Sequence, residues 1–260
     1  TRTFTIGNGT AEVDLSIDAP INNGALDKAG AGTLRLTAAN LYAGGTTITA
    51  GRLLVNNTSG SGTGSGSVTV NGGTLGGTGT IGGAVTVNPT GRIAPGTESA
   101  LGTLTLGSPP SILGTNFMRI NRGAAPSADK LVLTSGTLTY GGHLEVANAG
   151  AALTGGEVFT LYTAGSYGGA FVSSNLPPLA SGLNWDLGRL VADGRIAVNR
   201  RPAAGTPSWF TNTAPAVLEI PFATLISRAT DPDDDALTVT GVSLTSAQGI
   251  VLTTNATSIF

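Results

Sequence analysis

Cysteine is absent from this sequence of 260 residues, histidine occurs once, and charged residues make up only 11% of it. Without cysteine the chain forms neither disulfides nor thiolate metal sites, and the single His143 cannot build a facial histidine–carboxylate site. The formal net charge of -2 offers no basic surface to nucleic acid. No run of about 18 apolar residues occurs, so no membrane-spanning segment is predicted.

Glycine and short alternating apolar runs are what the sequence has in abundance. Glycine contributes 40 residues, about twice its usual share, while 40% of the residues are hydrophobic. Glycine weakens a helix by roughly 1 kcal/mol per position. Many short strands joined by tight turns are therefore expected, with enough apolar side chains for a core.

A short motif repeats at intervals of about 20 residues, a length that suits one coil of three short strands and three corners. In it a glycine precedes Thr or Arg and then Leu or Ile, and the runs around it alternate between apolar and polar residues. Copies at this interval begin at Gly32, Gly51, Gly73 and Gly91, and a further copy begins at Gly102 after a shorter step.

This period predicts an all-β fold, a right-handed parallel β-helix with aliphatic residues inside and Thr, Arg and Ser outside. One coil buries aliphatic side chains worth about 2 kcal/mol each, but ordering its residues costs about 1.5 kcal/mol apiece. Only stacked coils are therefore stable. The alternative is a sandwich or meander of antiparallel hairpins, because Asn71-Gly72 between two alternating runs is a hairpin signal.

Three segments in residues 28–56 carry a family resemblance. They are Lys28 to Leu36 (KAGAGTLRL), Tyr42 to Ile48 (YAGGTTI) and Ala50 to Asn56 (AGRLLVN). Together they resemble the passenger-associated β-strand repeat of autotransporters, which implies an extracellular parallel β-helix acting as stalk, adhesin or matrix component. A C-terminal outer-membrane barrel, part of the autotransporter pattern, is not recognised in this sequence.

Four segments are predicted along the chain. Residues 1–108 form the β-helix repeats, and residues 109–198 form terminal coils that cap it and end in a strand at Arg195–Val198. A polar, proline-containing linker follows at 199–215. Residues 216–260 begin a partial β-sandwich, with strands expected at Val217–Pro221 and Leu237–Val242.

The last segment is similar to the opening strands of bacterial cadherin-like and Ig-like repeats, in which a D-x-D-x-D turn precedes a strand. Asp231, Asp233 and Asp235 occupy that turn, with Asp234 between them. Alternate carboxylates converge readily on a hard cation, so they are candidate Ca²⁺ ligands; the alternative is a solvated acidic turn bent by Pro232. No other cofactor is expected.

No catalytic constellation is recognised, so the chain is not expected to be an enzyme. Between Asp27 and Asp129 the only acid is Glu98, whereas acid–base hydrolysis needs paired carboxylates, and His143 is expected at a surface position of a strand. The leading hypothesis is a non-catalytic structural or adhesive segment of a large, outer membrane-associated bacterial surface protein. Its expected partners are surface or matrix glycans or proteins and neighbouring repeats of a longer polypeptide.

Two alternatives remain open at this point. The first is a carbohydrate-binding module that stacks sugars on aromatic side chains, although such residues more often belong to a capping core. The second, less favoured, is a polysaccharide-degrading enzyme. The aromatic candidates are Tyr42, Tyr140, Tyr162, Tyr167 and Trp185.

Overall fold

The computed structural model describes residues 1–203, 217–233, 235–242 and 251–260, which fall into two compact units. Unit 1 comprises Thr1–Leu153, Glu157–Leu179 and Trp185–Ala197, and unit 2 comprises Thr154–Gly156, Ala180–Asn184 and Val198–Phe260. Residues 204–215 of the predicted linker, and Asp234 of the acidic turn, lie outside the described residues. Neither helix in the described part is long and apolar enough to cross a membrane.

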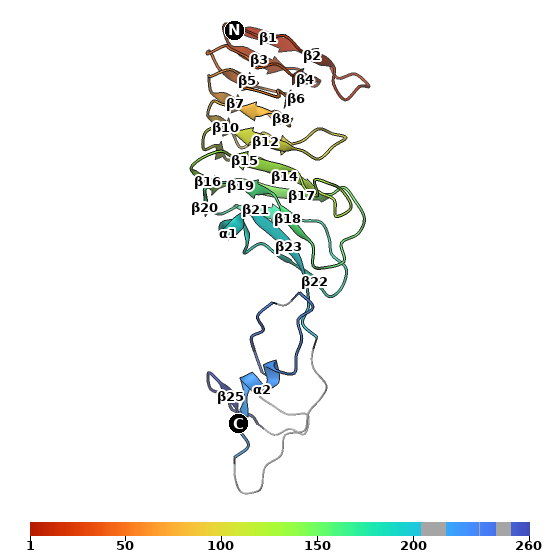
Figure 1. Ribbon diagram of the computed structural model, residues 1–260, viewed down its shortest axis with the longest axis vertical. Coiled ribbons are helices and arrows are strands. Elements are labelled where there is room, and N and C mark those ends of the chain that lie inside the picture. Colours follow the sequence, from red (N-terminus) through yellow and green to blue (C-terminus); the bar gives the residue numbers. More distant parts are fainter. Residues whose placement is uncertain (204–216, 234, 243–250) are drawn as a thin grey trace. The chain divides into compact units, whose positions relative to one another are not determined.

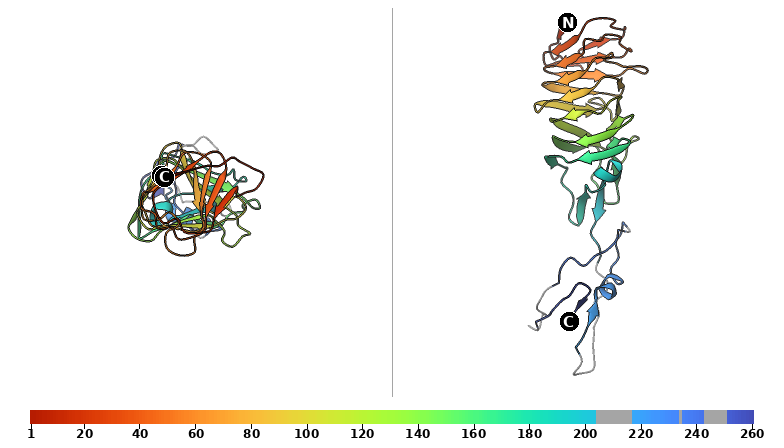
Figure 2. Two further views of the ribbon diagram at one scale, coloured as in Figure 1. Left: turned by 90° about the horizontal axis from the view of Figure 1, so that it is seen from above. Right: turned by 90° about the vertical axis from the view of Figure 1, so that its left-hand side faces the viewer.

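Unit 1 is a parallel β-helix, as the repeat predicts, and its coils follow one another along Figures 1 and 2. Strands from successive coils pair side by side and parallel in three stacked sheets, so the antiparallel hairpin alternative is wrong. The third sheet begins only at β9, because the corresponding stretches of the first coils, residues 37–45 and 56–67, contain no strand.

The strands of the three sheets follow in stacking order. The six-stranded sheet contains β1 (Arg2–Thr5), β3 (Leu26–Ala29), β5 (Thr46–Ile48), β7 (Val68–Val70), β10 (Val85–Val87) and β13 (Ser111–Ile112). The eight-stranded sheet contains β2 (Leu15–Ile17), β4 (Thr33–Leu36), β6 (Arg52–Val55), β8 (Gly73–Gly77), β11 (Gly91–Pro95), β14 (Thr115–Ile120), β17 (His143–Asn148) and β21 (Ser173–Asn175). The four-stranded sheet contains β9 (Thr80–Ile81), β12 (Thr103–Leu106), β15 (Lys130–Leu133) and β19 (Tyr162–Thr163).

The core of the helix is a set of aliphatic columns in register. Side chains at equivalent positions of successive strands stack on one another and are fully buried, which removes apolar surface that a single coil would leave exposed. In the eight-stranded sheet one such column contains Leu34, Leu53, Leu75 and Ile93. The neighbouring outward column contains Thr33, Arg52, Thr74 and Arg92.

Lys28 breaks the aliphatic pattern, because it occupies an inward position of β3 and is fully buried. Its ammonium group donates hydrogen bonds to the carbonyl oxygens of Ala29 (2.9 Å), Gly30 (2.8 Å) and Ala50 (3.1 Å). Burial lowers the pKa of the Lys28 ammonium, and the charge of Asp14 opposes that effect. The lysine of the repeat therefore ties the corner of its own coil to the corner of the next.

The last coils of unit 1 change character. β16 (Thr137–Tyr140) and β20 (Ser166–Gly169) form a separate parallel pair, while β18 (Val158–Thr160) pairs antiparallel with β23 (Arg195–Arg200) next to helix α1 (Leu190–Asp193). β23 contains the predicted strand at 195–198 and extends it by two residues. β22 spans Leu183–Asp186.

An aromatic cluster fills this end of unit 1. The Tyr140 and Tyr162 rings meet edge to face with centroids 5.1 Å apart, and Tyr140 also contacts Tyr167 and Phe171. Tyr140 and Tyr162 are buried, as is Tyr42 in an earlier coil. These three residues are therefore core, and the hypothesis that they form sugar-stacking platforms is wrong.

Unit 2 contains little regular structure in its described residues. β24 (Ile220–Pro221) pairs antiparallel with β25 (Ser258–Ile259), and a short helix α2 (Phe222–Ile226) follows β24. The strand expected at Val217–Pro221 is thus reduced to its last two residues, and residues 237–242 form no strand, contrary to expectation. The cadherin-like or Ig-like sandwich stays a prediction.

Candidate ligand-binding groove on the eight-stranded sheet

Two loops from distant coils meet over the outer face of the eight-stranded sheet. The first, the 7–14 loop, connects β1 to β2; the second, the 96–102 loop, connects β11 to β12. The Glu12 carboxylate accepts hydrogen bonds from the backbone N–H of Glu98 (2.7 Å) and from the N–H (3.3 Å) and hydroxyl (2.8 Å) of Ser99. The Ser99 hydroxyl is the largest cause of the lowered pKa of Glu12, against the opposing effect of burial.

A buried ion pair fixes the base of the 96–102 loop. Arg119 Nε lies 2.8 Å from Asp129 Oδ2, and Asp129 is fully buried. The remaining nitrogens of Arg119 donate to the carbonyl oxygens of Glu98 and Ala100, while Asp129 Oδ1 accepts the N–H of Gly102. Because every polar group of the pair has a partner, the charges hold the loop in one conformation.

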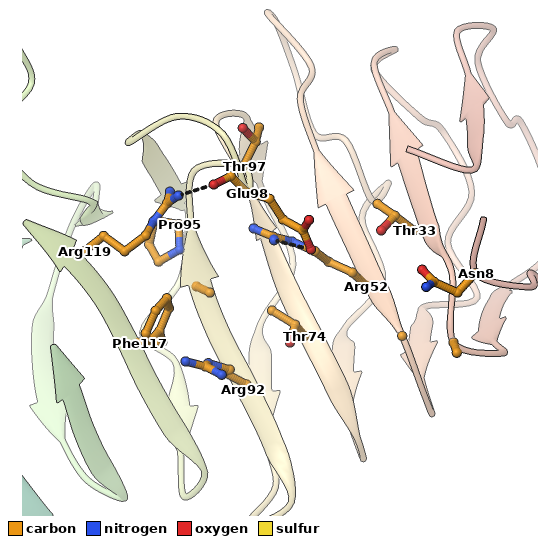
Figure 3. Close-up of a pocket in the computed structure, with 13 residues that line it drawn as sticks. Asn8, Thr33, Arg52, Thr74, Arg92, Pro95, Thr97, Glu98, Phe117 and Arg119 are labelled. Carbon is orange, nitrogen blue, oxygen red and sulfur yellow. Dashed lines mark hydrogen bonds and ion pairs between the residues drawn. The ribbon is translucent and has the colours of Figure 1, made fainter. Parts of the chain in front are cut away.

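Beneath the 96–102 loop lies a groove of about 450 Å³ (Figure 3). Its floor includes the outward column of strands β4, β6, β8 and β11, where side chains point away from the core because they alternate with the buried aliphatic residues. The groove is lined by Asn8, Ala31, Thr33, Gly51, Arg52, Thr74, Arg92, Ala94, Pro95, Thr97, Glu98, Phe117 and Arg119.

Arg52 is the least satisfied charge in this groove. Its side chain is only 15% exposed, yet its nearest carboxylate oxygen, Glu98 Oε1, lies 3.5 Å away, and its bond to the Gly96 carbonyl is 3.3 Å long. Within the described part of the chain its buried Nε has no hydrogen-bond partner. Burial lowers the pKa of the Arg52 guanidinium, which Glu98 only partly offsets.

Gly76 on β8 makes room for this guanidinium. A Cβ built on Gly76 would lie 3.3 Å from Arg52 Nη2 and 2.5 Å from the carbonyl oxygen of Ala94. The absent side chain lets Arg52 lie flat along the sheet under the 96–102 loop. The sequence alone does not predict this contact, since it depends on how that loop folds back.

Arg92 lies two strands further along the same column. Its guanidinium carbon sits 3.7 Å from the centroid of the Phe117 ring, a cation–π contact, and its Nη2 lies 3.1 Å from Glu145 Oε2. Its buried Nε likewise finds no partner among the described residues. Burial is the main cause of the lowered pKa of Arg92. The groove thus holds two guanidinium groups, each with only one carboxylate beside it.

His143, expected at the surface of a strand, is exposed on β17 and follows Thr115 in the outward column. Its Nδ1 lies 2.7 Å from the Ser173 hydroxyl on the next strand. The prediction of a surface position is confirmed.

The predicted calcium ligands lie in unit 2 and are engaged with protein donors. Asp231 Oδ1 accepts the backbone N–H groups of Asp233 (2.8 Å) and Asp235 (3.3 Å). The Asp233 carboxylate pairs with Arg200 at 3.3 Å, and Asp235 Oδ2 accepts a hydrogen bond from the Asn199 amide. No cluster of three or more acidic or histidine residues suited to a metal ion occurs in the part of the chain described here, which excludes Asp234. The calcium site stays a prediction.

Comparison with known families agrees with the resemblance seen in the sequence. Residues 26–55, from β3 to the end of β6, match the family described as the passenger-associated-transport-repeat. A repeat of this family indicates the passenger part of an autotransporter and an extracellular location. No curated protein matches the chain.

Proposed function

We propose that this chain is a non-catalytic structural and adhesive segment of a bacterial surface protein, displayed at the cell surface in association with the outer membrane. The observation that carries the proposal is the unbroken parallel register of the eight-stranded sheet from β2 to β21. Each coil hydrogen-bonds to the coils on either side, so a stack of this kind extends a surface by repetition rather than by enlarging a core.

Three carboxylates of unit 1 that are paired with arginines support a non-catalytic role. Asp129 pairs with Arg119, Glu145 with Arg92 and Glu157 with Arg122, and each of these acids is held by its partner. Hydrolysis of glycosides by the common mechanism needs two carboxylates facing each other across the scissile bond. The single carboxylate lining the groove, that of Glu98, does not provide such a pair.

The proposal is tested by an adhesion assay, in parallel with a test for enzymatic release of product. Beads coated with the purified chain are expected to stay on surfaces carrying bacterial cells, matrix proteins or polysaccharides under flow, whereas beads coated with heat-unfolded chain are released. The same preparation should liberate no soluble sugar or peptide from these surfaces. Release of product in proportion to the amount of folded chain would show an enzyme, and loss of retention on every surface would remove the adhesive role.

A further inference from the structure

We propose that the groove binds an acidic polysaccharide, and that Arg52 and Arg92 recognise its sugar carboxylates. This inference rests on the proposed adhesive function. It adds the class of ligand that the groove would bind in adhesion. It starts from the incomplete pairing of the two guanidinium groups: Arg52 has only a 3.5 Å contact with a carboxylate, and Arg92 bonds a single carboxylate oxygen, that of Glu145.

The charges of the groove favour an anion. Three arginines and one glutamate line it; Arg119 is already occupied by the buried carboxylate of Asp129, and Arg92 bonds one oxygen of Glu145, which lies outside the lining. Arg52 has only a long contact with Glu98, whose side chain is 64% exposed. A ligand carboxylate replacing Glu98 at Arg52 would form the paired, short hydrogen bonds that guanidinium groups make with carboxylates.

The arrangement along the sheet favours an extended ligand. Thr33, Arg52, Thr74 and Arg92 occupy equivalent positions of four adjacent strands, so hydroxyl and guanidinium groups alternate along the column. Adjacent strands are about 4.8 Å apart, which places the two arginines about 10 Å from each other. A polysaccharide lying along this column would meet a guanidinium group at every second strand and a threonine hydroxyl at the strands between them.

The remaining walls suit a sugar better than an acidic peptide. Asn8, Thr33, Thr74 and Thr97 supply amide and hydroxyl groups that can pair with sugar hydroxyls. The Phe117 ring, half-buried under Arg92, is the aromatic surface of the groove. Side chains of an acidic peptide would need apolar pockets for specificity, whereas this floor is an open row of polar groups.

Calorimetric titration of the whole chain with polygalacturonate oligomers tests the assignment. The matched probes are the same oligomers with methyl-esterified carboxyl groups and poly-L-glutamate of similar length. The acidic sugar is expected to bind, and both matched probes should bind at least tenfold more weakly. Equal binding of the ester would show that charge is not recognised, and equal binding of polyglutamate would point to an acidic protein partner; either result overturns the proposal.

Two sets of variants locate the site. The double variant Arg52→Gln/Arg92→Gln should weaken binding at least tenfold, while Arg35→Gln, an outward position of β4 outside the groove, should change it less than twofold. Thr74→Glu places a carboxylate between the two arginines without removing them, and should also block binding; Thr69→Glu on β7 is its control.

Circular dichroism checks that each variant is folded. If the Arg52→Gln/Arg92→Gln variant does not fold, Thr74→Glu alone tests the site. Equal losses in the groove and control variants would mean general charge attraction and overturn the proposal. Failure of all acidic sugars to bind would also overturn the ligand assignment. The bead assay decides the adhesive function separately, because it does not depend on the charge of the probe.

Discussion

The Lys28 ammonium group donates a hydrogen bond to the carbonyl oxygen of Ala50 at 3.1 Å, linking two successive coils inside the helix. The same group bonds the carbonyl oxygens of Ala29 and Gly30 at its own corner. A charged residue is rarely buried unless its donors are satisfied, and here three carbonyl dipoles replace water. This contact explains why a lysine stands at the start of the repeat.

Replacing the lysine by an apolar residue of similar length should therefore destabilise the helix. Lys28→Met leaves three carbonyl oxygens without this donor, a loss only partly offset by removing a buried charge, so we expect unfolding to become easier by about 2–4 kcal/mol. Urea unfolding followed by circular dichroism measures the change. Arg35→Met, which removes a half-buried arginine bonded to Ser16, is the control and should cost less. Unchanged stability of Lys28→Met would contradict this account.

Gly51, in the next copy of the motif, gives a second test of the corner. Its φ is +67°, and a Cβ there would lie 2.4 Å from the carbonyl oxygens of Gly30 and Gly32. Both backbone strain and overlap oppose a side chain, so Gly51→Ala should lower the free energy of unfolding by about 2 kcal/mol or more. Gly123→Ala is the matched control, because a Cβ at Gly123 meets its nearest atom at an ordinary 3.5 Å. Similar melting temperatures of the two variants would contradict the prediction.

The repeat was sufficient to predict the coils, because inward and outward positions alternate locally. Leu34, Leu53 and Leu75 could be placed in one core column from their neighbours alone. The groove could not be predicted, since Glu12 and Ser99 lie 87 residues apart and meet only after the coils from β2 to β11 have stacked. In sequence, Arg52 and Arg92 are ordinary outward residues of the motif. The 96–102 loop that contacts Arg52 and the Phe117 ring that packs against Arg92 come from other coils.

Two strands expected in unit 2 did not form as predicted, for a related reason. Val217–Pro221 and Leu237–Val242 alternate like strands, but alternation predicts a strand only where a partner strand and an apolar face are available. Unit 2 provides a two-residue pair, β24 with β25, in its described part. Tyr140 alternates with Thr139 and shares the inward parity of Leu138, so its burial follows from its neighbours. Tyr162 directly follows buried Leu161, and alternation does not predict its burial.

Of the acidic residues near the groove, Asp129 should cost the most stability when its charge is removed. Asp129→Asn leaves the Arg119 guanidinium without its charged partner in a buried position, which typically costs about 3–5 kcal/mol. The 96–102 loop loses its anchor at the same time, so limited proteolysis should cut there first. Glu145→Gln breaks a pair that is more than a third exposed on both sides and should cost less than about 1 kcal/mol. Equal effects of the two substitutions would contradict this ranking.

The lowered pKa of the Glu12 carboxyl group should make the stability of the folded chain depend on pH. Its folded-state pKa lies below the ordinary value of 4.5, so its contribution is fully present above that pH and is lost as the pH falls through the folded-state pKa. Glu12→Gln should therefore be less stable than wild type at neutral pH, with a difference that shrinks in more acidic solution. Melting temperatures measured between pH 3 and pH 7 provide the comparison. A difference that stays constant over this range would show that the Glu12 charge does not contribute.

For unit 2 we propose that the acidic turn binds Ca²⁺ through Asp231, Asp233 and Asp235, with the weak affinity of extracellular modules, about 10⁻⁴–10⁻³ M. Asp233 is paired with Arg200 and Asp235 with Asn199, so the ion must compete with these contacts for the same oxygens. Arg200→Ala should therefore strengthen Ca²⁺ binding in calorimetric titration, provided that the turn keeps its shape. Asp231→Asn should weaken binding, whereas Asp186→Asn, in β22, should not. Absence of calcium-dependent heat in both wild type and Arg200→Ala would leave the carboxylates as partners of Arg200 and Asn199 alone, and the acidic turn would be a structural bend.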